Sequence, residues 1–198
     1  MKVLGRGWQY TTYDLGGGRV LKKYNSLAQA YVVMFADCLR YGQPTPLKIP
    51  RYHKGCKETA MDSMKKVSNG PLESWMMGNP KVLNSLDYEQ DTLTPLHEKL
   101  ADAGTTEGKK IVDDFVAFNK LLVERSLIDK SFNITKNFGI DAQGKVVLMD
   151  LGELYSSKAA IDKQRRNRAW NSPYVVDVIS NDAVRTYFID QMDRSFGV

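Results

Sequence analysis

Cysteine and histidine are scarce in this chain of 198 residues, which has two of each. Cys38 and Cys56 lie apart and show none of the short spacings that zinc-binding motifs use. The scarcity of cysteine is typical of a reduced, cytoplasmic compartment. His53 and His97 argue against a histidine-rich metal site because two histidines are too few to form one.

Long hydrophobic runs are also lacking. No apolar stretch approaches the roughly 20 residues that a membrane-spanning helix needs. The opening residues, MKVLGRGWQY, lack the apolar core of a signal peptide. We therefore expect no membrane span and no cleaved signal peptide. The composition, 42% hydrophobic and 26% charged, is that of an ordinary globular protein, and the length suits one medium domain or two small lobes.

Positive charge is in modest excess, with a formal net charge of +5, and it is spread along the chain. One cluster stands out, KQRRNR at residues 163–168. We interpret it as a solvated helix face, and binding to a phosphate-rich or acidic partner is the alternative. The three tryptophans are scattered, and no helix-turn-helix pattern is visible, so the sequence does not favour nucleic acid as a partner.

The N-terminal third is rich in residues that favour β-strands. Residues 1–24 predict three strands, and the three glycines at 16–18 predict a hairpin between the second and third. Residues 26–41 have apolar positions at helical spacing and predict a helix. Residues 49–55 and 58–64 predict a fourth and a fifth strand. This part of the chain therefore predicts a five-stranded sheet with one helix.

A Gly-Pro break suggests two lobes, residues 1–67 and residues 68–198. The strongest helix pattern of the chain lies at residues 106–125, where one broad face is apolar. A polar stretch follows, and the segment at 138–150 then predicts a hairpin, because FGID and KVVLMD flank an Ala-Gln-Gly turn. Residues from about 157 onward predict helices.

Taken in order, these elements resemble a protein kinase. VLKKY resembles the third strand with its lysine, and AMDSMKKVSNGPL resembles the fifth strand, gatekeeper and hinge. NITKNFGID resembles the end of the catalytic loop, and VVLMDLGE resembles the strand that ends in Asp-Phe-Gly, with Leu for Phe. The resemblance implies an α+β, two-lobed kinase-like fold, with a five-stranded antiparallel N-lobe and a reduced, mostly helical C-lobe.

The resemblance implies ATP and Mg²⁺ as cofactors and assigns roles to four residues. Lys22 would contact the α- and β-phosphates; it lies two residues after a valine, as the family pattern requires, whereas Lys23 lies on the other face of the strand. Asn137 and Asp150 would hold the metal ion, which prefers oxygen ligands. Asp129 would be the catalytic base.

The nucleotide would meet two further groups of residues. Gly5 and Gly7 would form the turn that covers the phosphates, although a twisted strand is an equally good interpretation. Met64 would be the gatekeeper, and the backbone of Lys65 and Val67 would contact adenine. Core packing explains Met64 as well.

The first departure from the family is a missing glutamate. The helix at 26–41 should pair a glutamate with the lysine, and its only carboxylate is Asp37. Glu58 is another possible partner, and Gln29 could accept a hydrogen bond from the lysine without neutralising its charge. A buried lysine without a partner would tend to lose its charge.

The second departure concerns the catalytic loop, which has no His-Arg-Asp sequence. The family places its base five residues before the metal-binding asparagine, and that position is Phe132. Asp129 lies eight residues before Asn137, so it can serve only in a loop three residues longer. Asp129 as a simple turn residue is the alternative.

Only 46 residues, 153–198, follow the Asp-Leu-Gly motif, and no Ala-Pro-Glu motif occurs among them. This shortness resembles the minimal kinases that bacterial pathogens inject as effectors. The resemblance implies a Ser/Thr protein kinase that acts on a protein substrate, such as a host protein, and that is cytoplasmic or enters a host cell without a cleaved signal peptide. It leaves the oligomeric state open.

Three other functions remain open. The departures from the family pattern favour a pseudokinase that acts as a binding or scaffold module. A kinase of a small molecule would need a large helical substrate lobe, and a basic DNA-binding protein would need a binding helix that the pattern lacks.

Overall fold

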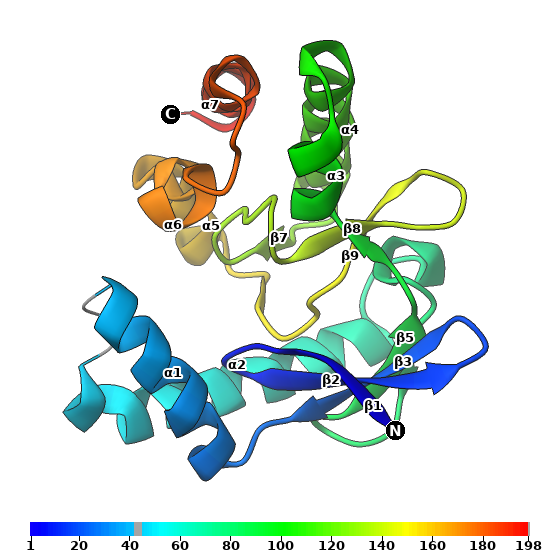
Figure 1. Ribbon diagram of the computed structural model, residues 1–198, viewed down its shortest axis with the longest axis vertical. Helices are drawn as coiled ribbons and strands as arrows, with labels where there is room; N and C mark the ends of the chain where they lie inside the picture. Colours follow the sequence, from blue (N-terminus) through cyan, green and yellow to red (C-terminus); the bar gives the residue numbers. More distant parts are fainter. Residues whose placement is uncertain (42–44, 198) are drawn as a thin grey trace. The chain divides into compact units, whose positions relative to one another are not determined.

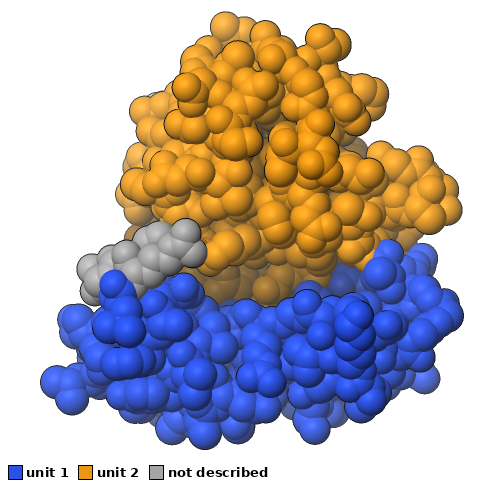
Figure 2. Space-filling view, in the orientation of Figure 1, with its two compact units in different colours: residues 1–70, 79–92 blue, residues 71–78, 93–198 orange. Residues whose placement is uncertain are grey.

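The structure, a computed structural model, describes residues 1–41 and 45–197. Contacts group the chain into two compact units (Figure 2). Unit 1 comprises Met1–Gly70 and Asn79–Thr92, and unit 2 comprises Pro71–Gly78 and Leu93–Val198. The architecture is α+β with a five-stranded antiparallel sheet, as predicted, and it is compatible with a two-lobed kinase-like fold.

The five-stranded sheet lies in unit 1 (Figure 1). Its strands pair in the order β1-β2-β3-β5-β4, and every pairing is antiparallel. Their bounds are Lys2–Arg6 (β1), Tyr10–Gly16 (β2), Arg19–Tyr24 (β3), Lys81–Val82 (β4) and Tyr88–Asp91 (β5). The predicted hairpin between the second and third strands is present, and its glycines at 16–18 all have positive φ, which favours glycine over residues with a side chain.

The strands predicted at 49–55 and 58–64 are wrong. Residues Ile49–Asn69 form one long helix, α2, which follows α1 (Leu27–Tyr41) and the short η1 (Pro46–Lys48). The buried side chains of α2 recur at helical spacing; they are Ile49, Cys56, Ala60, Ser63, Met64 and Val67. In short windows of this helix, apolar and polar residues alternate as they do in a strand, and Gly55 suggested a turn. A helix tolerates an internal glycine at a cost of about 1 kcal/mol relative to alanine.

Unit 1 therefore contains two long helices where one was predicted. The fourth and fifth strands lie within residues 81–91, which follow the predicted lobe boundary after Val67. Val67 itself lies within α2. Part of the predicted break after the first helix, residues 42–44, lies outside the described residues.

Unit 2 is mostly helical. Its elements are η2 (Ser74–Met77), β6 (Thr94–Pro95), α3 (Leu96–Asp102), α4 (Thr105–Glu124), β7 (Ile128–Asp129), β8 (Phe138–Ile140), β9 (Val146–Leu148), β10 (Leu154–Tyr155), α5 (Lys158–Arg166), η3 (Ala169–Asn171), α6 (Pro173–Val176) and α7 (Asp182–Phe196). Helices α4 and α7 pack side by side (Figure 1). Phe115 of α4 contacts the rings of Phe138 and Phe188, at centroid distances of 4.8 and 5.9 Å, so α4 joins the hairpin to α7.

Two predicted elements of unit 2 are confirmed. Helix α4 matches the predicted helix at 106–125, although Leu121 of its predicted apolar face is exposed. The β8–β9 hairpin has the predicted turn, in which the Asp141 carboxylate accepts hydrogen bonds from the backbone of Gln143 and Lys145. None of the described helices combines the length and apolar character that a membrane crossing requires.

Candidate active site

The polar loop after α4 begins at a strand. Strand β7 pairs with β10, and Asp129 lies opposite Leu154. The backbone N–H of Lys130 continues the ladder by donating to the carbonyl oxygen of Glu153 at 3.0 Å. The segment that follows Asp150-Leu151-Gly152 is thereby fixed to the start of the loop.

The Asp129 carboxylate organises this loop. Its Oδ2 atom accepts hydrogen bonds from the backbone N–H groups of Ser131, at 3.1 Å, and Asn133, at 3.0 Å. Its Oδ1 atom accepts a hydrogen bond from Nδ2 of Asn137 at 2.6 Å. The three additional residues of the loop therefore do not separate the carboxylate from the amide; the loop folds back and brings them together.

Asn133 gives the longer loop its shape. Its Oδ1 atom accepts hydrogen bonds from the backbone N–H groups of Thr135 and Lys136 and from Oγ1 of Thr135, at 3.2, 3.1 and 2.8 Å. The preceding residue, Phe132, has a left-handed φ of 50° and is buried against the ring of Trp170, at a centroid distance of 5.6 Å. Aromatic packing therefore offsets the strain of that backbone conformation.

Asn137 also connects the loop to the next strand. Its carbonyl oxygen accepts hydrogen bonds from the backbone N–H groups of Met149, at 2.8 Å, and Asp150, at 3.1 Å. One Asp150 oxygen accepts a hydrogen bond from the N–H of Gly152 at 3.0 Å, and Leu151 is fully buried. The hairpin therefore brings Asn137 and Asp150, 13 residues apart in sequence, to the same end of β8 and β9.

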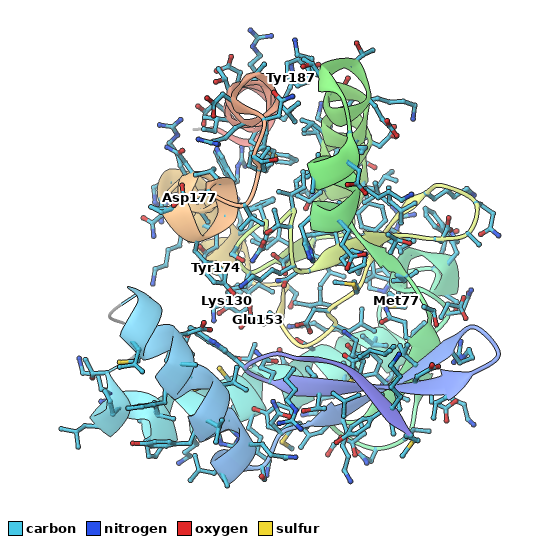
Figure 3. All side chains as sticks on the ribbon, in the orientation of Figure 1. Met77, Lys130, Glu153, Tyr174, Asp177 and Tyr187 are labelled. Atoms are coloured by element: carbon cyan, nitrogen blue, oxygen red, sulfur yellow. The ribbon has the colours of Figure 1, made fainter. Side chains whose placement is uncertain are left out.

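The protonation of Asp129 is strongly perturbed. The pKa of its carboxyl is raised from 3.8 to about 6, mainly because the fully buried carboxylate is desolvated and also because Glu153 adds negative charge nearby. Hydrogen bonds from Asn133, Asn137 and Ser131 oppose this rise. Glu153 forms an ion pair with Lys130 at 3.1 Å, and both side chains are labelled in Figure 3.

The oxygen atoms of Asn137 and Asp150 are of the type that Mg²⁺ prefers when nucleotide phosphates supply other ligands. Because Nδ2 of Asn137 donates to Asp129, the other amide atom, Oδ1, is the one that can bind a metal ion. Asp150, whose backbone N–H bonds the carbonyl oxygen of Asn137, offers a carboxylate. In the described part of the chain no three His, Cys, Asp or Glu residues form a metal-binding group. Mg²⁺ commonly takes one or two protein ligands and completes its shell with phosphate and water oxygens.

Lys22 lies in unit 1, on β3. It is 9% exposed and lies opposite Thr12 on β2 and Tyr88 on β5, whereas Lys23 is exposed. This difference follows from the alternation of side chains along a strand.

The residues considered as partners of Lys22 have other positions. Asp37 accepts a hydrogen bond from the Trp8 ring nitrogen, and Gln29 accepts hydrogen bonds from both the backbone N–H and the hydroxyl of Ser26. Glu58 lies on α2 and is exposed. The buried face of α2 carries no carboxylate.

The two glycines of the predicted phosphate turn lie at the β1–β2 connection. Gly5 is in β1, and the N–H of Gly7 donates to the carbonyl oxygen of Tyr10 at 2.8 Å. A Cβ atom at Gly5 would meet no atom within 4 Å, and one at Gly7 would meet only the Tyr10 carbonyl oxygen, at 3.6 Å. The fold therefore does not itself require glycine at either position.

The predicted gatekeeper and hinge are misplaced because their strand does not exist. Met64, Lys65 and Val67 lie on α2, where backbone polar groups are used within the helix. Met64 is 2% exposed and packs in the core. The chain passes from unit 1 to unit 2 directly after β5, at Thr92–Leu93.

The basic cluster at 163–168 is partly structural. Arg165 donates to the carbonyl oxygen of Phe196 at 2.8 Å, and Arg168 forms a two-point ion pair with Asp193. Both arginines thus tie this segment to α7, and only part of the cluster is a solvated helix face.

Sequence reasoning missed Asn133 and Glu153 as members of the site. A detectable signal existed for Asn133, because asparagine in a polar loop commonly bonds the backbone two residues on, in an Asx turn. Glu153 follows Asp-Leu-Gly directly, but only the β7–β10 pairing brings it near Asp129.

No family model and no curated protein matches this sequence. Solved structures with a similar backbone include Rv3197 from Mycobacterium tuberculosis in complex with erythromycin, at a TM-score of 0.48 and 11% identity, over 90% of this chain and 53% of that one. The structure of WbdD has a TM-score of 0.49 and 13% sequence identity, over 100% of this chain and 48% of that one. A second structure of WbdD, described as a bifunctional kinase-methyltransferase, has a TM-score of 0.45 and 13% sequence identity, over 93% of this chain and 42% of that one. The chain thus spans about half the length of these proteins or less, and likeness at this level identifies neither a family nor an activity.

Proposed function

We propose that the chain acts as a protein kinase that transfers the γ-phosphoryl group of ATP, with Mg²⁺, to a Ser or Thr hydroxyl of a protein. The observation that carries this proposal is the double role of Asn137. Its side chain meets the Asp129 carboxylate at 2.6 Å, and its backbone holds Asp150 at 3.1 Å. This geometry supports the proposal because it links the proposed base to one proposed metal ligand and links that ligand to the second.

In the proposed reaction, Asp129 accepts the proton of the acceptor hydroxyl. The hydroxyl oxygen forms a bond to the γ-phosphorus, and the bond to ADP breaks, with its electron pair leaving on ADP. Asn137 and Asp150 would hold the Mg²⁺ ion, which would neutralise charge on the phosphate oxygens. Lys22 would contact the α- and β-phosphates, the role that the resemblance to protein kinases gives it.

Transfer of labelled phosphate from ATP tests this proposal. We expect Asp150→Asn to lower transfer to the chain itself or to an added protein at least about 100-fold, because one metal ligand is weakened. Asp141→Asn is the matched control, since asparagine can keep the turn bonds of Asp141 and transfer should persist. Equal transfer by both variants and the parent would contradict the assignment of Asp150.

A second function has a specific observation in its favour. The Asp129 carboxylate is fully buried and already accepts four hydrogen bonds, so an acceptor hydroxyl can reach it only if the loop moves. A pseudokinase that binds nucleotide and acts as a scaffold would fit this geometry. Such a protein would gain thermal stability with Mg²⁺ and ATP but would transfer no phosphate.

A further inference from the structure

A pocket of about 570 Å³ lies within unit 1, and its lining includes none of the residues of the candidate active site. It is bounded by the end of β3, the start of α1, the middle of α2 and the connection between β4 and β5. Its size is in the range of sites for small ligands. Lys23 lines it, whereas Lys22 belongs to the opposite face of the strand.

The walls of this β3–α2 pocket are held by hydrogen bonds. Oδ1 of Asp87 accepts a hydrogen bond from the N–H of Tyr24 at 2.8 Å, and Oδ2 accepts one from the side-chain amide of Asn84 at 3.0 Å. Nε2 of His53 bonds the carbonyl oxygen of Asn25 at 3.0 Å, and this carbonyl can only accept. The pocket is therefore preformed, and a ligand would pay little for ordering it.

The pocket has an excess of positive charge. Lys23 and Lys57 line it, and in the described part of the chain neither has an ion-pair partner. Asp87 is the one carboxylate among the residues recorded in its lining, and both of its oxygens already accept hydrogen bonds. An incoming anion would therefore meet two available ammonium groups.

Sequence neighbours do not neutralise these lysines. Lys57 lies four residues after His53 on α2, so one turn of the helix presents two basic groups on the same face. The residue opposite Lys23 on β2 is Thr11. Lys23, Lys57 and the ring of His53 thus place basic groups along the pocket, with Asp87 as the one carboxylate among the described residues of its lining.

The rings around the cations favour an organic anion over a bare ion. Tyr13 and Tyr24 line the same pocket, and the ring of His53 lies 5.6 Å from that of Tyr24. From the cavity, the charges and the rings together, we propose that the β3–α2 pocket binds a phosphomonoester. This site is independent of the proposed kinase reaction.

Titration followed by amide NMR tests the site. The probes are an acetylated, amidated Ala-phosphoserine-Ala peptide, its unphosphorylated form, glucose 6-phosphate and inorganic phosphate, at about 50 mM NaCl to limit screening. We expect shifts at residues 23–26 and 84–87, with a Kd of about 1 mM or below for at least one phosphomonoester. The better of the two organic probes shows whether the phosphate comes from a protein or from a metabolite.

Variants separate this site from general charge and from the candidate active site. The double change Lys23→Gln and Lys57→Gln should weaken binding at least about tenfold. Lys54→Gln on the same helix and Lys22→Met on the same strand should leave binding unchanged. Thermal melting checks that all variants fold.

Three outcomes would overturn the proposal. The first is the absence of any shift at about 10 mM probe, tenfold above the expected Kd. The second is an affinity for inorganic phosphate equal to that for both phosphomonoesters. The third is that Lys54→Gln weakens binding as much as the double change does.

Discussion

Replacing Asp129 with asparagine should change how stability depends on pH. The pKa of this carboxyl is raised from 3.8 to about 6 in the folded chain, mainly by burial. A raised pKa means that folding favours the protonated form, so its contribution to stability is fully present below about pH 4 and is lost as pH rises through 6. A difference of about two pKa units corresponds to about 3 kcal/mol.

Urea unfolding of the parent and of Asp129→Asn, followed by tryptophan fluorescence from pH 4 to pH 8, measures this effect. The free energy of unfolding of the parent should fall by about 3 kcal/mol relative to the variant between pH 4 and pH 7. Asp141→Asn is the control and should follow the parent. A constant difference between parent and Asp129→Asn across this range would refute the idea that burial perturbs Asp129.

Two further changes test the packing that builds the site. Asn133→Ala removes an acceptor of three hydrogen bonds and should lower the free energy of unfolding by about 1–3 kcal/mol, whereas Ser131→Ala should cost less than about 0.5 kcal/mol; similar losses would argue against Asn133 as the organiser of the loop. Gly139→Ala would place a Cβ atom 2.9 Å from Cβ of Leu93 and should cost about 1–3 kcal/mol in urea unfolding. Gly5→Ala, with no atom within 4 Å, is its control, and equal costs would contradict the close approach at Gly139.

Periodic patterns predicted the parts of the fold that have them. Helices α1 and α4 have apolar residues at helical spacing. Glycines mark the turn between β2 and β3, and the β8–β9 hairpin has a recognisable Ala-Gln-Gly turn. The segment 49–69 also has helical spacing, but its apolar residues are diluted by charge and interrupted by Gly55. Strands β4 and β5 are short and mostly polar. They take their conformation from pairing, β5 with β3 and β4 with β5, rather than from their own sequence.

The candidate site was predictable in its residue types and not in its geometry. Asn137 and Asp150 flank a recognisable hairpin, so their proximity follows from local sequence. Whether Asp129 could reach Asn137 depended on how the loop folds, and that is determined by the buried side chains of Phe132 and Asn133. Asp37 accepts a hydrogen bond from Trp8, 29 residues away in sequence, and no spacing rule indicates that pairing.

Paramagnetic broadening by Mn²⁺ with ATP tests the central claim most directly. The proposal is that Asn137 and Asp150 of the β8–β9 hairpin together hold a metal ion that arrives with ATP. It predicts that the NMR signals of both residues broaden together when Mn²⁺ and ATP are both present, with little effect from Mn²⁺ alone. Equal broadening by Mn²⁺ without ATP, or broadening of only one of the two residues with it, would contradict the account.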